Sequence, residues 1–190
     1  MNYPSLENAY VRLIPLRPEH FELLLPLSIQ VDLYMYGPSD ISTPDKLKAY
    51  IHDAFAKAKQ GSAQPYIIYD KTKKAYAGST RFGHMDTNHK TLHIGWTWLG
   101  TDFRGSGINT HIKYLMLDYA FTAMDMEKVA FRIDERNMRS RKAVEKLGAT
   151  LEGILRQNLI VKNGFRRSTA CYSILKSEWP KIKTTFFKSI

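Results

Sequence analysis

Residues 98–110, WLGTDFRGSGINT, place three small residues between an expected strand and the start of an expected long helix. Gly105, Ser106 and Gly107 would let an anion approach the backbone closely, and the positive end of the helix dipole would add to the attraction. The segment therefore predicts an anion-binding loop, and a pyrophosphate suits such a loop. A tight turn without a ligand is the alternative, because two glycines also permit that.

Two familiar nucleotide motifs match this loop poorly. A P-loop needs a lysine that reaches the phosphates, and Ser106 stands at that place. A dinucleotide-binding loop needs a third glycine where Thr110 stands, and it belongs to an opening βαβ unit, although Asp134 could imitate the ribose-binding acid. The sequence therefore favours neither an NTPase nor a dinucleotide-dependent enzyme.

Histidines in the two strands expected before the loop could transfer protons. Imidazole titrates near neutrality, so His93 could accept a proton from an amine, and His84 and Asp86 are alternatives. A structural role is the competing interpretation for a lone strand histidine. His84, His89 and His93 would lie across a hairpin turn with no fourth ligand evident, so we predict no metal site.

These residues need strands and helices to position them. Alternating apolar patterns bounded by turn residues predict strands at residues 10–16, 66–70, 75–84, 91–99, 129–133, 151–161 and 165–175. Helical spacing and capping signals predict helices at residues 18–29, 44–60, 108–123 and 137–147. A hairpin turn is expected at residues 162–164. No linker or repeat divides the chain, so we expect one domain over residues 1–190.

The charge balance and the apolar pattern limit the environment of the protein. The chain has 28 Lys+Arg against 18 Asp+Glu, a net charge of +10, which suits a polyanionic partner or a solvated basic surface. No apolar stretch approaches the ~18 residues that a bilayer span requires. The N-terminal residues lack the apolar region of a secretory signal, and Cys171, the only cysteine, cannot form an internal disulfide. We therefore expect a cytoplasmic protein that does not bind membranes.

Residues 104–109, RGSGIN, resemble the R-x-x-G-x-[G/A] signature of the GNAT superfamily of acyl-CoA-dependent N-acetyltransferases, with Asn109 in place of the final small residue. The longer string IGWTWLGTDFRGSGINT, residues 137–140 (NMRS) and residues 146–149 (KLGA) resemble the RimJ/RimL-like branch. The likeness extends over residues 10–179, and the expected order of strands and helices agrees with it. It implies an α/β (α+β) fold with a mixed, mostly antiparallel central sheet of about seven strands and helices on both faces.

The resemblance also implies acetyl-CoA as the cofactor. In that family the amides of the loop bind the pyrophosphate, and a bulge splays the neighbouring strand so that its main chain can bond the pantetheine arm. A main-chain N–H there could also stabilise the oxyanion, an effect worth ~3 kcal/mol. The corresponding residues here are Trp98, Leu99, Arg104, Gly105, Ser106, Gly107, Ile108, Asn109 and Thr110.

Three further positions follow from the resemblance. The side chain of Asn137 would meet the pantetheine, and an ordinary helix N-cap is the alternative role. Ser140 would donate a hydrogen bond or a proton to the departing sulfur, because Val144 occupies the place where many relatives have a tyrosine acid. His93 would be the base, since it stands where many relatives have a catalytic glutamate.

The function implied is an acetyl-CoA-dependent N-acetyltransferase, in which a deprotonated primary amine attacks the thioester directly in a ternary complex. The RimJ/RimL-like motifs favour a protein N-terminal amine, with a ribosomal protein as one expected acceptor and the ribosome as one expected partner. A polyamine, an amino acid or an antibiotic is an alternative acceptor, because variable segments such as residues 31–42 set acceptor specificity.

A rival function of another class is a non-catalytic basic module that binds RNA or ribosomes, which the charge and the 12% aromatic content support. DNA is not an expected partner. A homodimer is compatible with the sequence.

Overall fold

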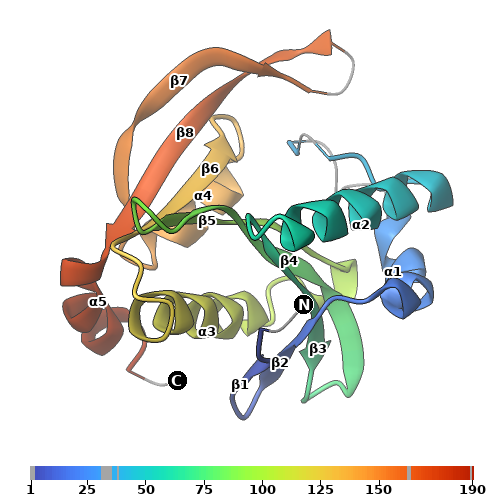
Figure 1. The fold of residues 1–190 in the computed structure, drawn as a ribbon, viewed down its shortest axis with the longest axis horizontal. Helices are drawn as coiled ribbons and strands as arrows, with labels where there is room; N and C mark the ends of the chain where they lie inside the picture. The colour runs from blue at the N-terminus through green and yellow to red at the C-terminus, as the bar shows by residue number, and fades with distance from the viewer. Residues whose placement is uncertain (1–2, 31–35, 38, 162–163, 189) are drawn as a thin grey trace.

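The computed structural model describes residues 3–30, 36–37, 39–161, 164–188 and 190. Within these residues one sheet of eight strands has the order β1-β2-β3-β4-β5-β6-β8-β7 (Figure 1). Only β5 and β6 run parallel; every other neighbouring pair of described strands is antiparallel. The strands are β1 (Leu6–Glu7), β2 (Val11–Pro15), β3 (Gln64–Asp70), β4 (Ala75–Asp86), β5 (Thr91–Leu99), β6 (Lys128–Asp134), β7 (Thr150–Ile160) and β8 (Arg166–Leu175).

The predicted mixed, mostly antiparallel α/β fold is confirmed, with one more strand than expected. The addition is β1, which pairs with β2. Two residues are too few to show an alternating pattern, so only the partner strand makes β1 recognisable. The hairpin turn expected at residues 162–164 lies partly outside the described residues, as does the segment 31–42 expected to affect acceptor choice.

Helices cover both faces of the sheet, as predicted (Figure 1). On one face lie α1 (Phe21–Ser28) and α2 (Pro44–Lys59), and on the other lie α3 (Ile108–Thr122), α4 (Met138–Glu145) and α5 (Trp179–Phe186). The sequence did not predict α5, whose buried Trp179 packs beside Phe121 of α3 and whose buried Ile182 lies beside Gly148, which follows α4. Within the described residues, no helix is long and apolar enough to cross a bilayer.

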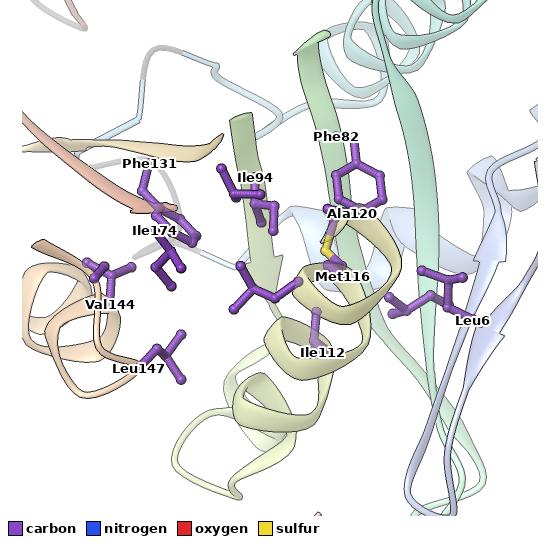
Figure 2. Packing of buried hydrophobic residues seen from close by; sticks show 14 of the residues in the cluster. Leu6, Phe82, Ile94, Ile112, Met116, Ala120, Phe131, Val144, Leu147 and Ile174 are labelled. Carbon is purple, nitrogen blue, oxygen red and sulfur yellow. The ribbon is translucent and has the colours of Figure 1, made fainter. Parts of the chain in front are cut away.

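Local signals explain where the helices begin and end. The hydroxyl oxygen of Thr43 accepts a hydrogen bond from the amide of Lys46 at 3.3 Å, and Pro44 occupies the first turn of α2. The long helix α3 buries a stripe of apolar side chains beneath the centre of the sheet. Figure 2 shows Met116 and Ala120 of this helix beside Phe82 of β4.

Candidate active site

The parallel ladder between β5 and β6 is short. It contains the pairs Thr91–Lys128, Leu92–Val129 and His93–Ala130, and no further pair joins these two fully described strands. Beyond His93, β5 continues to Leu99 while β6 turns away with β8 and β7 (Figure 1). The sheet is therefore open between two neighbouring strands, as the resemblance implies.

A bulge in β5 lies beside this opening. The register with β4 shifts between the pairs Ser79–Trp98 and Arg81–Gly95, and Trp96 in between has a φ of +49°. A bulge inserts an extra residue and re-aims the groups that follow it. The last residues of β5 are therefore set at a new angle next to the opening.

Leu99 and Trp98 differ in where their peptide groups point. Gly100 donates its amide to the carbonyl of Ala77 at 2.9 Å, so Leu99 and Gly78 form a non-hydrogen-bonded pair. The N–H and C=O of Leu99 consequently point away from β4, towards the opening. Those of Trp98 point towards β4, and its side chain is buried on the face that α1 and α2 cover.

The loop after β5 presents free amides to solvent. Gly105 and Gly107 have φ values of +73° and +86°, in the left-handed region that favours glycine. The amides of Gly105, Ser106 and Gly107 find no acceptor among the described residues, and all three residues are exposed. A Cβ at either glycine would meet no atom within 4 Å, so the space in front of the loop is open.

Other residues of the predicted loop serve its structure. The Nε–H of Arg104 donates to the carbonyl of Leu99 at 3.1 Å, which ties the loop to the end of β5. Ile108 is buried in the core, and the amide of Thr110 donates to the carbonyl of Gly107 at 2.9 Å. Arg104, Ile108 and Thr110 therefore hold in place the loop that carries the exposed amides.

The helix that follows β6 begins at the same edge of the sheet, because parallel strands end at the same edge. Asn137 caps α4 by accepting the amide of Ser140 at 3.1 Å through its side-chain oxygen. The hydroxyl of Ser140 makes no hydrogen bond with any described residue. Val144 points into the core. The N-termini of α3 and α4 thus lie at the ends of the two diverging strands.

His93 is half-buried at the point where the strands part. Burial, together with the nearby charges of His84, Arg132 and Lys128, lowers its pKa to about 4. Its ring centroid lies 4.8 Å from that of His84, which is exposed. His93 is therefore unprotonated at neutral pH, the form in which imidazole accepts a proton.

The other polar residues near His93 form no metal cluster. Asp86, the further alternative base, accepts the amide of His89 in the β4–β5 turn at 2.9 Å. Across the described part of the chain, no three His, Cys, Asp or Glu side chains lie close enough together to hold a metal ion.

Comparison with known proteins assigns this arrangement to a family. Residues 11–150 match the acetyltransferase (GNAT) domain. The chain belongs to the GNAT family. It is 26% identical to a Bacillus subtilis protein named "Putative ribosomal N-acetyltransferase YdaF". The aligned 178 residues cover 90% of this chain and 94% of that protein. This chain is an N-acetyltransferase of that family, which uses acyl-CoA.

Solved GNAT structures show the same fold. A GCN5-related N-acetyltransferase from Brucella melitensis superposes with a TM-score of 0.85 at 26% identity, over 99% of this chain and 86% of that chain. RimJ from Mycobacterium smegmatis, in complex with CoA-disulfide, superposes with a TM-score of 0.80 at 22% identity, over 93% and 88%. The second likeness concerns the fold alone.

A buried cation that the sequence analysis did not predict lies beside this GNAT site. Lys113 of α3 is 5% exposed, and its Nζ donates to the hydroxyl of Thr97 at 2.8 Å. That hydroxyl also shares a hydrogen bond of 2.7 Å with the hydroxyl of Thr80. Burial lowers the pKa of Lys113 to about 7. Lysine at a helical apolar position is the only sequence signal that could have revealed it.

Proposed function

We propose that this enzyme transfers the acetyl group of acetyl-CoA to a primary amine, and that the acceptor is the N-terminal amine of a protein. The observation that carries the proposal is the opening between β5 and β6 beyond the His93–Ala130 pair, with a helix N-terminus at the end of each strand. Such an opening exposes main-chain donors and acceptors within a sheet that would otherwise pair them.

The residues present fit a cofactor of this kind. A diphosphate needs several N–H donors on an unobstructed surface, and the amides of Gly105, Ser106 and Gly107 are unpaired within the described structure and exposed. The N–H of Leu99 suits a carbonyl of a pantetheine arm, whereas its C=O already accepts the Nε–H of Arg104. The side-chain amide of Asn137 lies at the same edge. When bound, acetyl-CoA supplies the thioester that the amine attacks.

Each side chain at the opening then has a proposed role. Main-chain N–H groups at the end of β5 stabilise the negative charge that develops on the carbonyl oxygen. His93 accepts the proton that the nitrogen loses, and Ser140 donates a hydrogen bond to the leaving sulfur. With a pKa of about 4, His93 is too weak a base to deprotonate a free ammonium group efficiently, so it acts after the nitrogen has bonded to carbon.

This weak base fits an α-amine better than a lysine side chain. An α-amine has a pKa of about 8 against about 10.4 for lysine, so more of it is unprotonated before it reaches the enzyme.

The name of the Bacillus subtilis relative supports a ribosomal protein as the source of that amine. The family assignment argues against a purely non-catalytic RNA-binding role for the chain.

The test measures thiol release from acetyl-CoA. The acceptors are peptides with the free N-termini of ribosomal proteins, the same peptides with a blocked N-terminus and one lysine, and polyamines. We expect turnover with the free N-termini and a loss of at least about tenfold on blocking. Turnover with polyamines alone would reassign the acceptor to small molecules, and no thiol release with any amine would overturn the proposal.

A further inference from the structure

Arg81 of β4 is a buried arginine, and two of its three guanidinium nitrogens have no partner in the described structure. Its side chain is 1% exposed, and its guanidinium carbon lies 4.8 Å and 4.7 Å from the ring centroids of Tyr50 and Trp96. Its Nη1 donates to Asp53 at 3.2 Å. Its Nε and Nη2 are buried and have no partner among the described residues.

The two unpaired nitrogens form one recognition edge. Nε–H and one N–H of Nη2 are parallel in the planar guanidinium group, and this fork binds both oxygens of a carboxylate. A buried donor without an acceptor costs about 1–3 kcal/mol, more when it is charged, so native proteins rarely leave one unpaired. Arg81 leaves two adjacent donors unpaired within the described structure, which points to an acceptor supplied from outside.

The charge around Arg81 also favours an anion. Its only carboxylate partner in the described structure, Asp53, is shared with Lys57, whose Nζ lies 2.8 Å from Asp53 Oδ1. Partial burial opposes ionisation of Asp53, but hydrogen bonds from Lys57 and Arg81 outweigh it and lower the pKa of that carboxyl. Two cations therefore face one anion, and a second carboxylate would complete the balance.

Arg81 lies on the face of the sheet opposite the cofactor loop. Its ring partners Tyr50 and Trp96 belong to the cluster that α1 and α2 cover, whereas α3 packs on the other face. The buried Nε1 of Trp98, on the same face, is also unpaired within the described structure. Gly95 of β5, opposite Arg81, is two residues from His93. The unused donors thus gather near the opening, on the face away from the pyrophosphate loop.

We propose that Arg81 binds a carboxylate of the acceptor substrate, so that the enzyme selects amines that also carry a carboxylate. This inference rests on the proposed function and narrows its acceptor class. The carboxylate belongs either to an acidic side chain near a peptide N-terminus or to the α-carboxylate of a small acceptor. Because both nitrogens are covered, the carboxylate must displace a neighbouring side chain, and the ring of Trp96 lies directly against Arg81.

The first experiment compares acceptors that differ only in one charge. One pair consists of tetrapeptide amides with aspartate or asparagine in the second position, and the other consists of a dipeptide and its C-terminal amide. We expect kcat/KM to be at least about tenfold higher for the carboxylate member of one pair. The pair that shows the difference tells whether Arg81 binds an acidic side chain or the α-carboxylate of a small acceptor. Values within about twofold in both pairs would overturn the inference. Turnover of either member still supports the proposed function.

A binding measurement tests Arg81 separately from turnover. The same peptides are titrated into the cofactor-free protein while tryptophan fluorescence is recorded, with Trp96→Phe to assign the signal. The carboxylate peptide is expected to change the fluorescence at a concentration at least about tenfold lower than the amide peptide. Equal titrations overturn the inference, whether or not any peptide is acetylated.

Variants around the fork complete the test. Arg81→Lys keeps the charge but lacks the fork, so it should remove the preference for the carboxylate peptide. Asp53→Asn, at a half-exposed position, should strengthen that preference by removing the competing carboxylate. Lys59→Gln is the control, because it removes an exposed charge of the same helix that pairs with neither Asp53 nor Arg81 in the described structure. If both Arg81→Lys and Asp53→Asn keep the wild-type preference for the carboxylate peptide, the inference is contradicted. If Arg81→Lys does not fold, the result with Asp53→Asn alone decides.

Discussion

His93 and Ala130 are the last residues that face each other across β5 and β6. From this pair onwards the two strands separate, and each is followed by a helix that begins at the same edge of the sheet. The pair therefore places a histidine that is unprotonated at neutral pH, the loop amides and the first turn of α4 around one opening. The predictions below test each of these groups.

Gly107→Asp should abolish the rise in melting temperature that coenzyme A causes. The new carboxylate would stand beside the exposed amides and repel the pyrophosphate. Gly61→Asp is the matched control, because Gly61 also has a positive φ, of +75°, and a Cβ there also meets no atom within 4 Å. Differential scanning fluorimetry with and without coenzyme A measures the shift. A normal shift in Gly107→Asp would refute the assignment of the loop.

Ser140→Ala should lower kcat while leaving the Kd for coenzyme A and the melting temperature nearly unchanged. The amide of Ser140, not its hydroxyl, bonds to Asn137, so alanine keeps the helix cap. Steady-state kinetics and calorimetry separate the two effects. An unaltered kcat removes the proposed role of the hydroxyl.

Asn137 can be tested for two roles at once. Asn137→Ser keeps an N-cap side chain and should preserve stability, whereas Asn137→Ala should cost about 1 kcal/mol of unfolding free energy. If the side-chain amide also contacts the pantetheine, both variants weaken coenzyme A binding. Urea denaturation and calorimetric titration measure these quantities. Wild-type coenzyme A affinity in Asn137→Ser would restrict the residue to capping.

His93→Gln should lower kcat by at least about tenfold, by a factor that stays constant from pH 6 to pH 8. The constancy follows from the pKa of about 4, since wild-type His93 is unprotonated throughout that range. An NMR titration of the imidazole should give a midpoint near 4, and His84→Gln should raise it because the charge of His84 lowers the pKa of His93. Full activity in His93→Gln would exclude it as the base.

Lys113→Met should raise the free energy of unfolding most at or below pH 7. Burial lowers the pKa of Lys113 from 10.5 to about 7, so between these values the unfolded chain binds a proton that the folded chain lacks. Wild-type stability should therefore rise with pH across that window, by at most about 1.4 kcal/mol per pH unit from this group, and the variant should lose the slope. Lys181→Met, on the exposed side of α5, is the control. Equal slopes in wild type and Lys113→Met would show that the lysine is not buried in its neutral form.

Local chain signals identified much of the fold and the cofactor side of the site. Proline and threonine at the start of α2, the two glycines before α3 and asparagine before α4 act through bonds to residues a few positions away, so their effects can be inferred without the fold. The loop and the 137–140 motif accordingly lie where the sequence analysis expects them. Their roles in catalysis stay predictions.

Sequence by itself thus determined the family motifs, the order of most elements and the residues that begin the helices. Only the tertiary structure decided that β1 pairs at the sheet edge and that Lys113 lies beneath Thr97. It alone also decided that Arg81 lies buried with an unused fork, and that burial and the neighbouring His84 lower the pKa of His93. Burial and the pairing of charges depend on groups far apart in the chain, and these meet only when the sheet and its two helical layers assemble.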